Sequence, residues 1–95
     1  MKVSELLDSP EKWTQQAGAR DRHEAAASYD SVRAVKWCLS GALCKCYPIG
    51  APRKRAIAKL KLSLPKRFEG QMVLANDHET TTFGMVRRWV LRAGI

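Results

Sequence analysis

Residues 31–46 read SVRAVKWCLSGALCKC and carry the clearest helical pattern in this chain. Trp37 and Cys38 widen the apolar face of this segment, so it predicts a central, mostly buried helix that begins at Ser31. Gly41 lies inside the helix at a cost of about 1 kcal/mol relative to alanine, which a close approach of another segment would explain. The face itself recurs mostly at steps of three and four residues: Val32, Val35, Leu39, Ala42, Leu43 and Cys46.

A second helix is expected after a turn. Residues 47–52, YPIGAP, contain two prolines and end the central helix. Because this link is long and proline-rich, the sequence does not predict a helix-turn-helix, and sequence-specific regulation is disfavoured. The KLKLSL run at 59–64 alternates as a half-buried strand does, but we favour a helix over 53–64 that ends at Pro65. Three residues match the helical spacing: Ile57, Leu60 and Leu64.

The two ends of the chain add a short helical region and a final helix. Ser9-Pro10-Glu11 is a helix-start signal, anchored by apolar side chains on either side of it: Leu6, Leu7 and Trp13. Residues 72–75, MVLA, predict a strand or an extended connector. The final helix follows the cap residues 80–82 and ends at Gly94. Its apolar face contains Phe83, Val86, Val90 and Ala93.

Length and composition limit the fold class. The 95 residues, of 10.7 kDa and 45% hydrophobic, suit one folded domain over residues 1–95. We expect a mainly α fold, a compact domain of three to four helices with a short β-hairpin or an irregular excursion around residues 15–30. No apolar run reaches the roughly 18–20 residues of a membrane span. MKVSELLD at residues 1–8 lacks the apolar core of a signal peptide, so we expect a cytoplasmic protein that does not bind a membrane.

The positive charge is concentrated in the middle of the sequence. The net charge is +8, but residues 1–32 hold four basic and six acidic residues, and residues 69–95 hold three of each. Residues 33–68 hold ten basic residues and no aspartate or glutamate. Solvated surfaces normally mix both signs, so this segment predicts a surface for a polyanion or for an acidic protein.

Cysteines and candidate catalytic groups favour a protein without metal or enzymatic chemistry. Cys38, Cys44 and Cys46 are odd in number and lack paired zinc-ligand spacing, so we expect reduced thiols, largely buried. A composite site with His23 or His78 is the alternative. No nucleophile-elbow, zinc-protease or phosphate-loop motif occurs. We therefore expect no catalytic residue, no metal and no cofactor. The residues whose side chains could serve as a nucleophile or as an acid–base pair are Asp21, Asp77, His23, His78 and Cys38.

Several blocks of the chain resemble a family of small, uncharacterised bacterial and phage domains. The most specific block is Trp37-Cys38-x-x-Gly41-Ala42-Leu43, and the closing helix has Val90 where leucine is usual. The other blocks are Trp13-Thr14-Gln15, Ala19-Arg20-Asp21, Ala34-Val35 and Asn76-Asp77, with Val86 and Ala93 in the closing helix. The resemblance implies a compact, mostly helical fold and no known activity. Residues 22–30 lack the family's glycine-centred turn. The basic cluster 53–67 is not a family hallmark, so we attribute it to this protein's own function.

The leading functional hypothesis is a non-enzymatic, basic accessory protein encoded by a phage or mobile element. It would dock its positive face on nucleic acid or on a nucleoprotein complex, and so inhibit a host machine such as a defence complex; inhibition of an acidic host protein is an alternative. The residues expected to make that contact are Arg53, Lys54, Arg55, Lys59, Lys61, Lys66 and Arg67, with Arg33, Lys36 and Lys45 nearby.

Two other functions stay open. The first is a domain that binds a nucleotide or metabolite in a pocket with an aromatic wall and convergent polar groups: Trp13, Gln15, Arg20, Asp21 and Trp37. The second is a protein–protein module that uses exposed hydrophobic residues, namely Ile49, Phe68 and Ile95.

Overall fold

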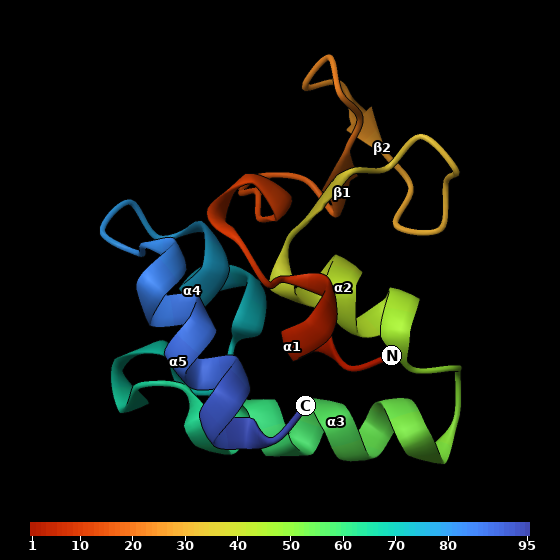
Figure 1. Ribbon diagram of the computed structural model, residues 1–95. Coiled ribbons are helices and arrows are strands. Elements are labelled where there is room, and N and C mark those ends of the chain that lie inside the picture. Colours follow the sequence, from red (N-terminus) through yellow and green to blue (C-terminus); the bar gives the residue numbers. More distant parts are fainter.

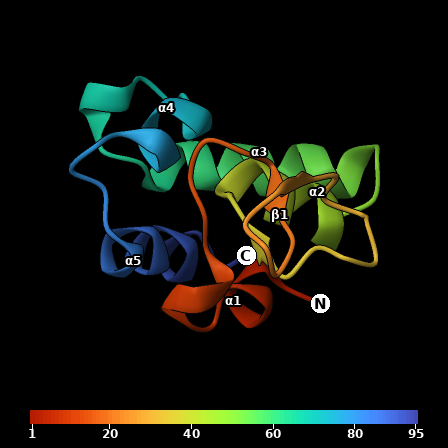
Figure 2. The same ribbon diagram turned by 90° about the horizontal axis from the view of Figure 1, so that it is seen from above.

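Five helices surround one hydrophobic core in the computed structural model, which describes residues 1–95 (Figure 1). The helices are α1 (Val3–Leu6), α2 (Leu39–Cys46), α3 (Ala51–Ser63), α4 (Met72–Asp77) and α5 (Phe83–Ala93). Two 3-10 turns accompany them: η1 (Pro10–Lys12) follows α1, and η2 (Lys66–Phe68) lies between α3 and α4. Figure 2 shows α4 and α5 on opposite sides of α3. None of the helices has the length and apolar character needed to cross a bilayer.

A small antiparallel sheet makes the fold mixed rather than purely helical. Its strands β1 (Ala19–Arg20), β2 (Ala26–Ala27) and β3 (Lys36–Trp37) lie in the order β2-β1-β3. The hairpin expected around residues 15–30 is therefore present. Asp21 shapes its turn, because the carboxylate accepts hydrogen bonds from the backbone N–H groups of Ala25 (3.0 Å) and His23 (2.8 Å). These bonds hold the pKa of Asp21 below its ordinary value.

The prediction that the central helix begins at Ser31 is wrong. The helix begins at Leu39, and Lys36-Trp37 instead pairs with β1. Val35 and Trp37 are of residue types that suit a strand, and an available sheet edge outweighs the helical spacing there. Val32, expected on the buried face, is fully exposed. Cys38 lies at the N-cap of α2, where its sulfur accepts a hydrogen bond from Gly41 N at 3.3 Å.

Three other boundaries differ from the sequence predictions. Residues 72–75 begin the helix α4 instead of forming a strand or connector. Near the N-terminus, the helix α1 precedes Ser9, and Pro10–Lys12 form only a 3-10 turn. The expected long link between α2 and α3 is only four residues, because Ala51 and Pro52 already belong to α3, whose first turn accepts proline. Gly50 closes that link with a φ of 116°, a conformation that favours glycine.

The helices expected around residues 53–64 and 83–93 are confirmed. In α3, helical spacing prevails over the alternation at 59–64, and the helix ends before Pro65. In α5, the Thr82 hydroxyl accepts a hydrogen bond from Met85 N at 3.3 Å, and Gly94 ends the helix in the left-handed region.

Gly41 is required by a close contact between α2 and the sheet segment, as the sequence predicted. A Cβ on Gly41 would lie 1.9 Å from the carbonyl oxygen of Gly18. That carbonyl accepts a hydrogen bond from Cys38 N at 3.1 Å, so it is fixed in place at the start of α2. The two backbones therefore meet where no side chain fits.

We predict that Gly41→Ala lowers the free energy of unfolding by about 2 kcal/mol or more, because one backbone must move. Gly84→Ala is the matched control: this glycine is also in the first turn of a helix, but its nearest neighbour is 3.8 Å away. The control should leave stability unchanged or raise it by up to about 1 kcal/mol. Urea unfolding of both variants measures the difference, and equal effects would contradict the close contact.

Candidate nucleic-acid interface

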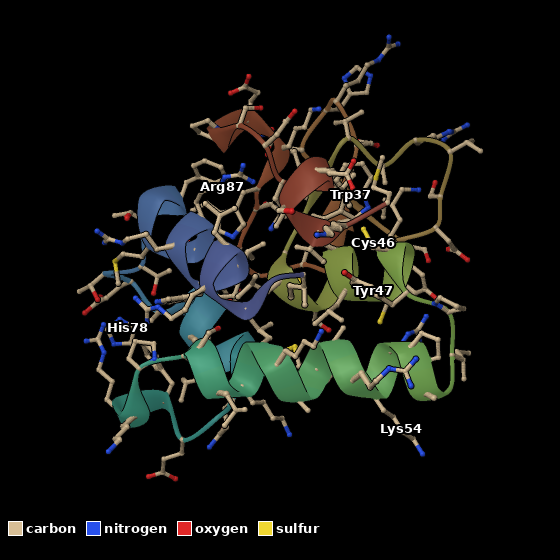
Figure 3. All side chains as sticks on the ribbon, turned by 60° about the horizontal axis from the view of Figure 1, so that its bottom comes forward. Trp37, Cys46, Tyr47, Lys54, His78 and Arg87 are labelled. Carbon is tan, nitrogen blue, oxygen red and sulfur yellow. The ribbon has the colours of Figure 1, made fainter.

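The outward face of α3 and the adjacent turn η2 form an exposed basic surface, which we call the α3 surface. It consists of Lys54, Arg55, Lys59, Lys61, Lys66 and Arg67. Figure 3 shows Lys54 pointing away from the body of the molecule. The chain has two salt bridges, Asp8–Lys12 and Glu24–Lys36, and neither involves this surface. All six cations therefore lack an internal carboxylate partner.

Arg53 is placed differently from its neighbours in the predicted cluster. Its guanidinium donates hydrogen bonds to the carbonyls of Tyr47 and Cys44, both at 2.9 Å, and lies 5.9 Å from the ring centre of Tyr29. These carbonyls lie at the C-terminal end of α2, where the last carbonyl groups of a helix have no backbone N–H partner within it. Arg53 thus fixes α3 to α2, and its Nε and Nη2 atoms already have partners inside the protein.

Arg33, Lys36 and Lys45 do not join the α3 surface. Arg33 and Lys36 lie in and beside the sheet, at the opposite end of the molecule from α3 (Figure 1). The ammonium of Lys36 pairs with the Glu24 carboxylate. The ammonium of Lys45 lies 5.5 Å from the ring centre of Trp37, within range of a cation–π contact.

Asn76 binds two of the five residues that were predicted to line a ligand pocket, Trp13 and Gln15. It is only 1% exposed, and its Oδ1 accepts hydrogen bonds from Trp13 Nε1 (2.7 Å) and from Leu39 N (3.1 Å). Its Nδ2 donates to the Thr14 carbonyl (3.1 Å) and to the Asp77 carboxylate (2.8 Å). Sequence reasoning assigned Asn76 only a turn-forming role. Its central position depends on contacts 37 to 63 residues apart, which spacing along the chain does not reveal.

The five predicted pocket residues direct their side-chain groups mainly to the protein itself. Gln15 Nε2 donates to the carbonyls of Asn76 (2.8 Å) and His78 (3.1 Å), and Trp37 Nε1 donates to Tyr29 O (3.0 Å). Arg20 has all its guanidinium nitrogens bonded to acceptors in residues 14–24. Of the five, only Asp21 lines the surface concavity of about 440 Å³ that it shares with Arg22, His23, Val32, Arg33 and Val35.

The groups considered for catalysis are each hydrogen-bonded to nearby parts of the chain. Asp77 accepts a hydrogen bond from Gln16 N at 2.9 Å, and the His78 ring bonds to Thr80 two residues away. Burial raises the pKa of the Cys38 thiol, which favours its protonated, unreactive form. No three His, Cys, Asp or Glu side chains gather in a way that could hold a metal ion.

The prediction of three exposed hydrophobic residues is wrong for two of them. Ile49 is exposed, but Phe68 and Ile95 are only 2% exposed. The turn η2 directs Phe68 inward, where its ring meets the edge of Trp89 with 6.0 Å between ring centres. Leu62, which the sequence placed in no site, is 89% exposed on the outward face of α3.

These features define a small, mainly helical domain with one unpaired basic surface and an internally bonded polar centre. The chain belongs to a family of unknown function, DUF6197, whose sequence model matches residues 1–94. This match agrees with the family resemblance seen in the sequence. No curated protein and no solved structure matches the chain significantly.

We predict that Arg53→Ala lowers the free energy of unfolding by about 1–2 kcal/mol, because it leaves two carbonyls of α2 without their charged donor. Lys54→Ala, at the adjacent exposed position, should change it by less than about 0.5 kcal/mol. Urea unfolding compares the two. An unchanged free energy of unfolding for Arg53→Ala would show that the link between α2 and α3 does not need this side chain.

We expect Asn76→Ala to lower the free energy of unfolding by at least about 3 kcal/mol. The substitution leaves the indole N–H of Trp13, the N–H of Leu39 and the carbonyl of Thr14 without their hydrogen-bond partner. Gln71→Ala is the control, because Gln71 is exposed at the N-cap of α4 and makes no capping bond through its side chain. Chemical unfolding followed by tryptophan fluorescence measures both. Similar stabilities for the two variants would show that the hydrogen bonds of Asn76 contribute little to the stability of the fold.

Proposed function

We propose that this protein is a non-enzymatic module that binds nucleic acid through the α3 surface. The observation that carries the proposal is that six exposed cations share one surface and none has an internal carboxylate partner. Like charges gathered in this way repel one another, and a polyanion removes that repulsion. Nucleic acid supplies closely spaced phosphates, about one charge per 1.7 Å of duplex axis.

The type of side chain supports phosphate contact rather than base stacking. Lysine and arginine form strong, charge-assisted hydrogen bonds to phosphate oxygens. The six residues include no aromatic side chain, and the nearest one in sequence, Phe68, is buried. A stacking platform for single strands needs exposed rings, so the surface favours the sugar–phosphate backbone. By occupying nucleic acid or a nucleoprotein complex, the protein would block or redirect the machine that works on it.

We predict a steep dependence of binding on salt. Four to six phosphate contacts correspond to a slope of log affinity against log salt of about −4 to −5. Fluorescence anisotropy with labelled duplex and single-stranded DNA and RNA, between about 50 and 200 mM salt, measures it. Lys54→Glu with Lys61→Glu should weaken binding by at least tenfold. Arg22→Glu with Arg33→Glu, which changes the net charge equally at the opposite end of the molecule, should weaken it much less.

The double variant at Arg22 and Arg33 shows whether nucleic acid binds to the α3 surface or is attracted by the net charge of the whole protein. Equal losses in the two double variants would show that net charge alone drives binding. Absence of binding to every nucleic acid at low salt would refute the proposal and leave an acidic protein as the partner of the α3 surface.

A further inference from the structure

The shape of α3 narrows the kind of nucleic acid that the α3 surface fits. Only Ala56, Leu60 and Ser63 of its thirteen residues are buried, and the helix lies along one edge of the molecule (Figure 1). The helix is about 20 Å long, and an α-helix with its side chains is about 10–12 Å across. The major groove of B-form DNA is about 12 Å wide and admits an α-helix.

The cations of α3 form two strips on either side of its outward crest. Lys54 and Lys61 are seven residues apart and so lie within about 20° of each other around the helix axis. Arg55 and Lys59 are four apart and lie within about 40° of each other. The two strips are about 130° apart, and neither faces the core. A helix lying on a single row of phosphates could use only one strip, whereas a helix between two rows would use both.

The crest between the strips is uncharged and exposed. It consists of Ala51, Ala58 and Leu62. Small and apolar side chains allow the helix to come close to base edges without burying a charge, and they can contact thymine methyl groups. The crest carries no side-chain hydrogen-bond group that could choose one base over another.

The connection before α3 also suits this arrangement. α2 and α3 are joined by only the four residues Tyr47–Gly50, and a connection this short limits how far α3 can move relative to α2. Arg53 secures that connection through its bonds to Tyr47 and Cys44. α3 is therefore presented as a fixed helix and not as a mobile arm.

We infer that α3 enters the major groove of B-form duplex DNA, with Lys54 and Lys61 on one phosphate strand and Arg55 and Lys59 on the other. This inference rests on the proposed binding of nucleic acid by the α3 surface and specifies its target. Binding is to duplex DNA with little sequence selection. Duplex RNA does not fit, because its A-form major groove is deep and too narrow for a helix.

Three duplexes of one sequence test the inference by anisotropy at a single salt concentration. They are plain DNA, DNA with glucosylated 5-hydroxymethylcytosine in place of cytosine, and RNA. The glucosyl groups fill the major groove and leave the phosphates unchanged. We expect plain DNA to bind at least tenfold more tightly than either of the others. Equal affinity for plain and groove-filled DNA would overturn groove entry while leaving the proposed function intact.

Two double variants test the strips on plain DNA. The first is Lys54→Ala with Lys61→Ala, and the second is Arg55→Ala with Lys59→Ala, so that each deletes two expected phosphate contacts. Each pair should reduce the magnitude of the salt slope by about 1.8. A loss confined to one pair would show that α3 lies on a single phosphate row and would overturn the inference. Failure of the unmodified protein to bind any duplex would instead refute the proposed function itself.

Discussion

The hydrogen bonds of Asn76 are the interaction on which the rest of the fold depends. One buried amide joins the segment around Trp13, the first turn of α2 and the end of α4, and each of its two polar atoms has two partners. A buried amide with all its partners is stabilising, and the same amide with one partner missing is costly. The arrangement therefore specifies a single packing of these three elements, and through α2 it sets where α3 begins.

Some arginines of this protein bond to backbone carbonyls at helix ends, and others are exposed and free to contact a partner. Arg53 bonds to carbonyls at the end of α2, Arg87 to those of Ser4 and Leu7 at the end of α1, and Arg92 to that of Ser63 at the end of α3. Figure 3 shows Arg87 among the side chains between α5 and α1. A planar group with several donors suits such helix ends. Most of the cations left free for a partner are accordingly on α3 and η2, with lysines prominent among them.

The sequence predicted the elements whose pattern and local signals agreed. α5 has an apolar face, a capping threonine and a terminal glycine, and α3 has helical spacing between prolines; both were predicted correctly. Residues 31–38 were not, because helical spacing there competes with strand pairing to β1, and that partner is distant in sequence. The basic cluster was visible as an acid-free segment. The sequence did not show that Arg53 bonds inside the protein while the other cations of the cluster are exposed. That distinction depends on where the carbonyls at the end of α2 lie in the folded chain.

The position of α1 has a consequence for how the chain is made. This four-residue helix packs against α5, and the Leu7 carbonyl accepts a hydrogen bond from Arg87, 80 residues later. At ribosomal rates of about 5–20 residues per second, α1 waits about 4 to 16 s for that partner. Because α1 also contacts α2, which is made earlier, part of the surface of Val3, Leu6 and Leu7 is covered before α5 is made, and only their packing against α5 waits for the end of synthesis. The packing of α1 is thus completed only when synthesis reaches α5, although its contact with α2 becomes possible earlier.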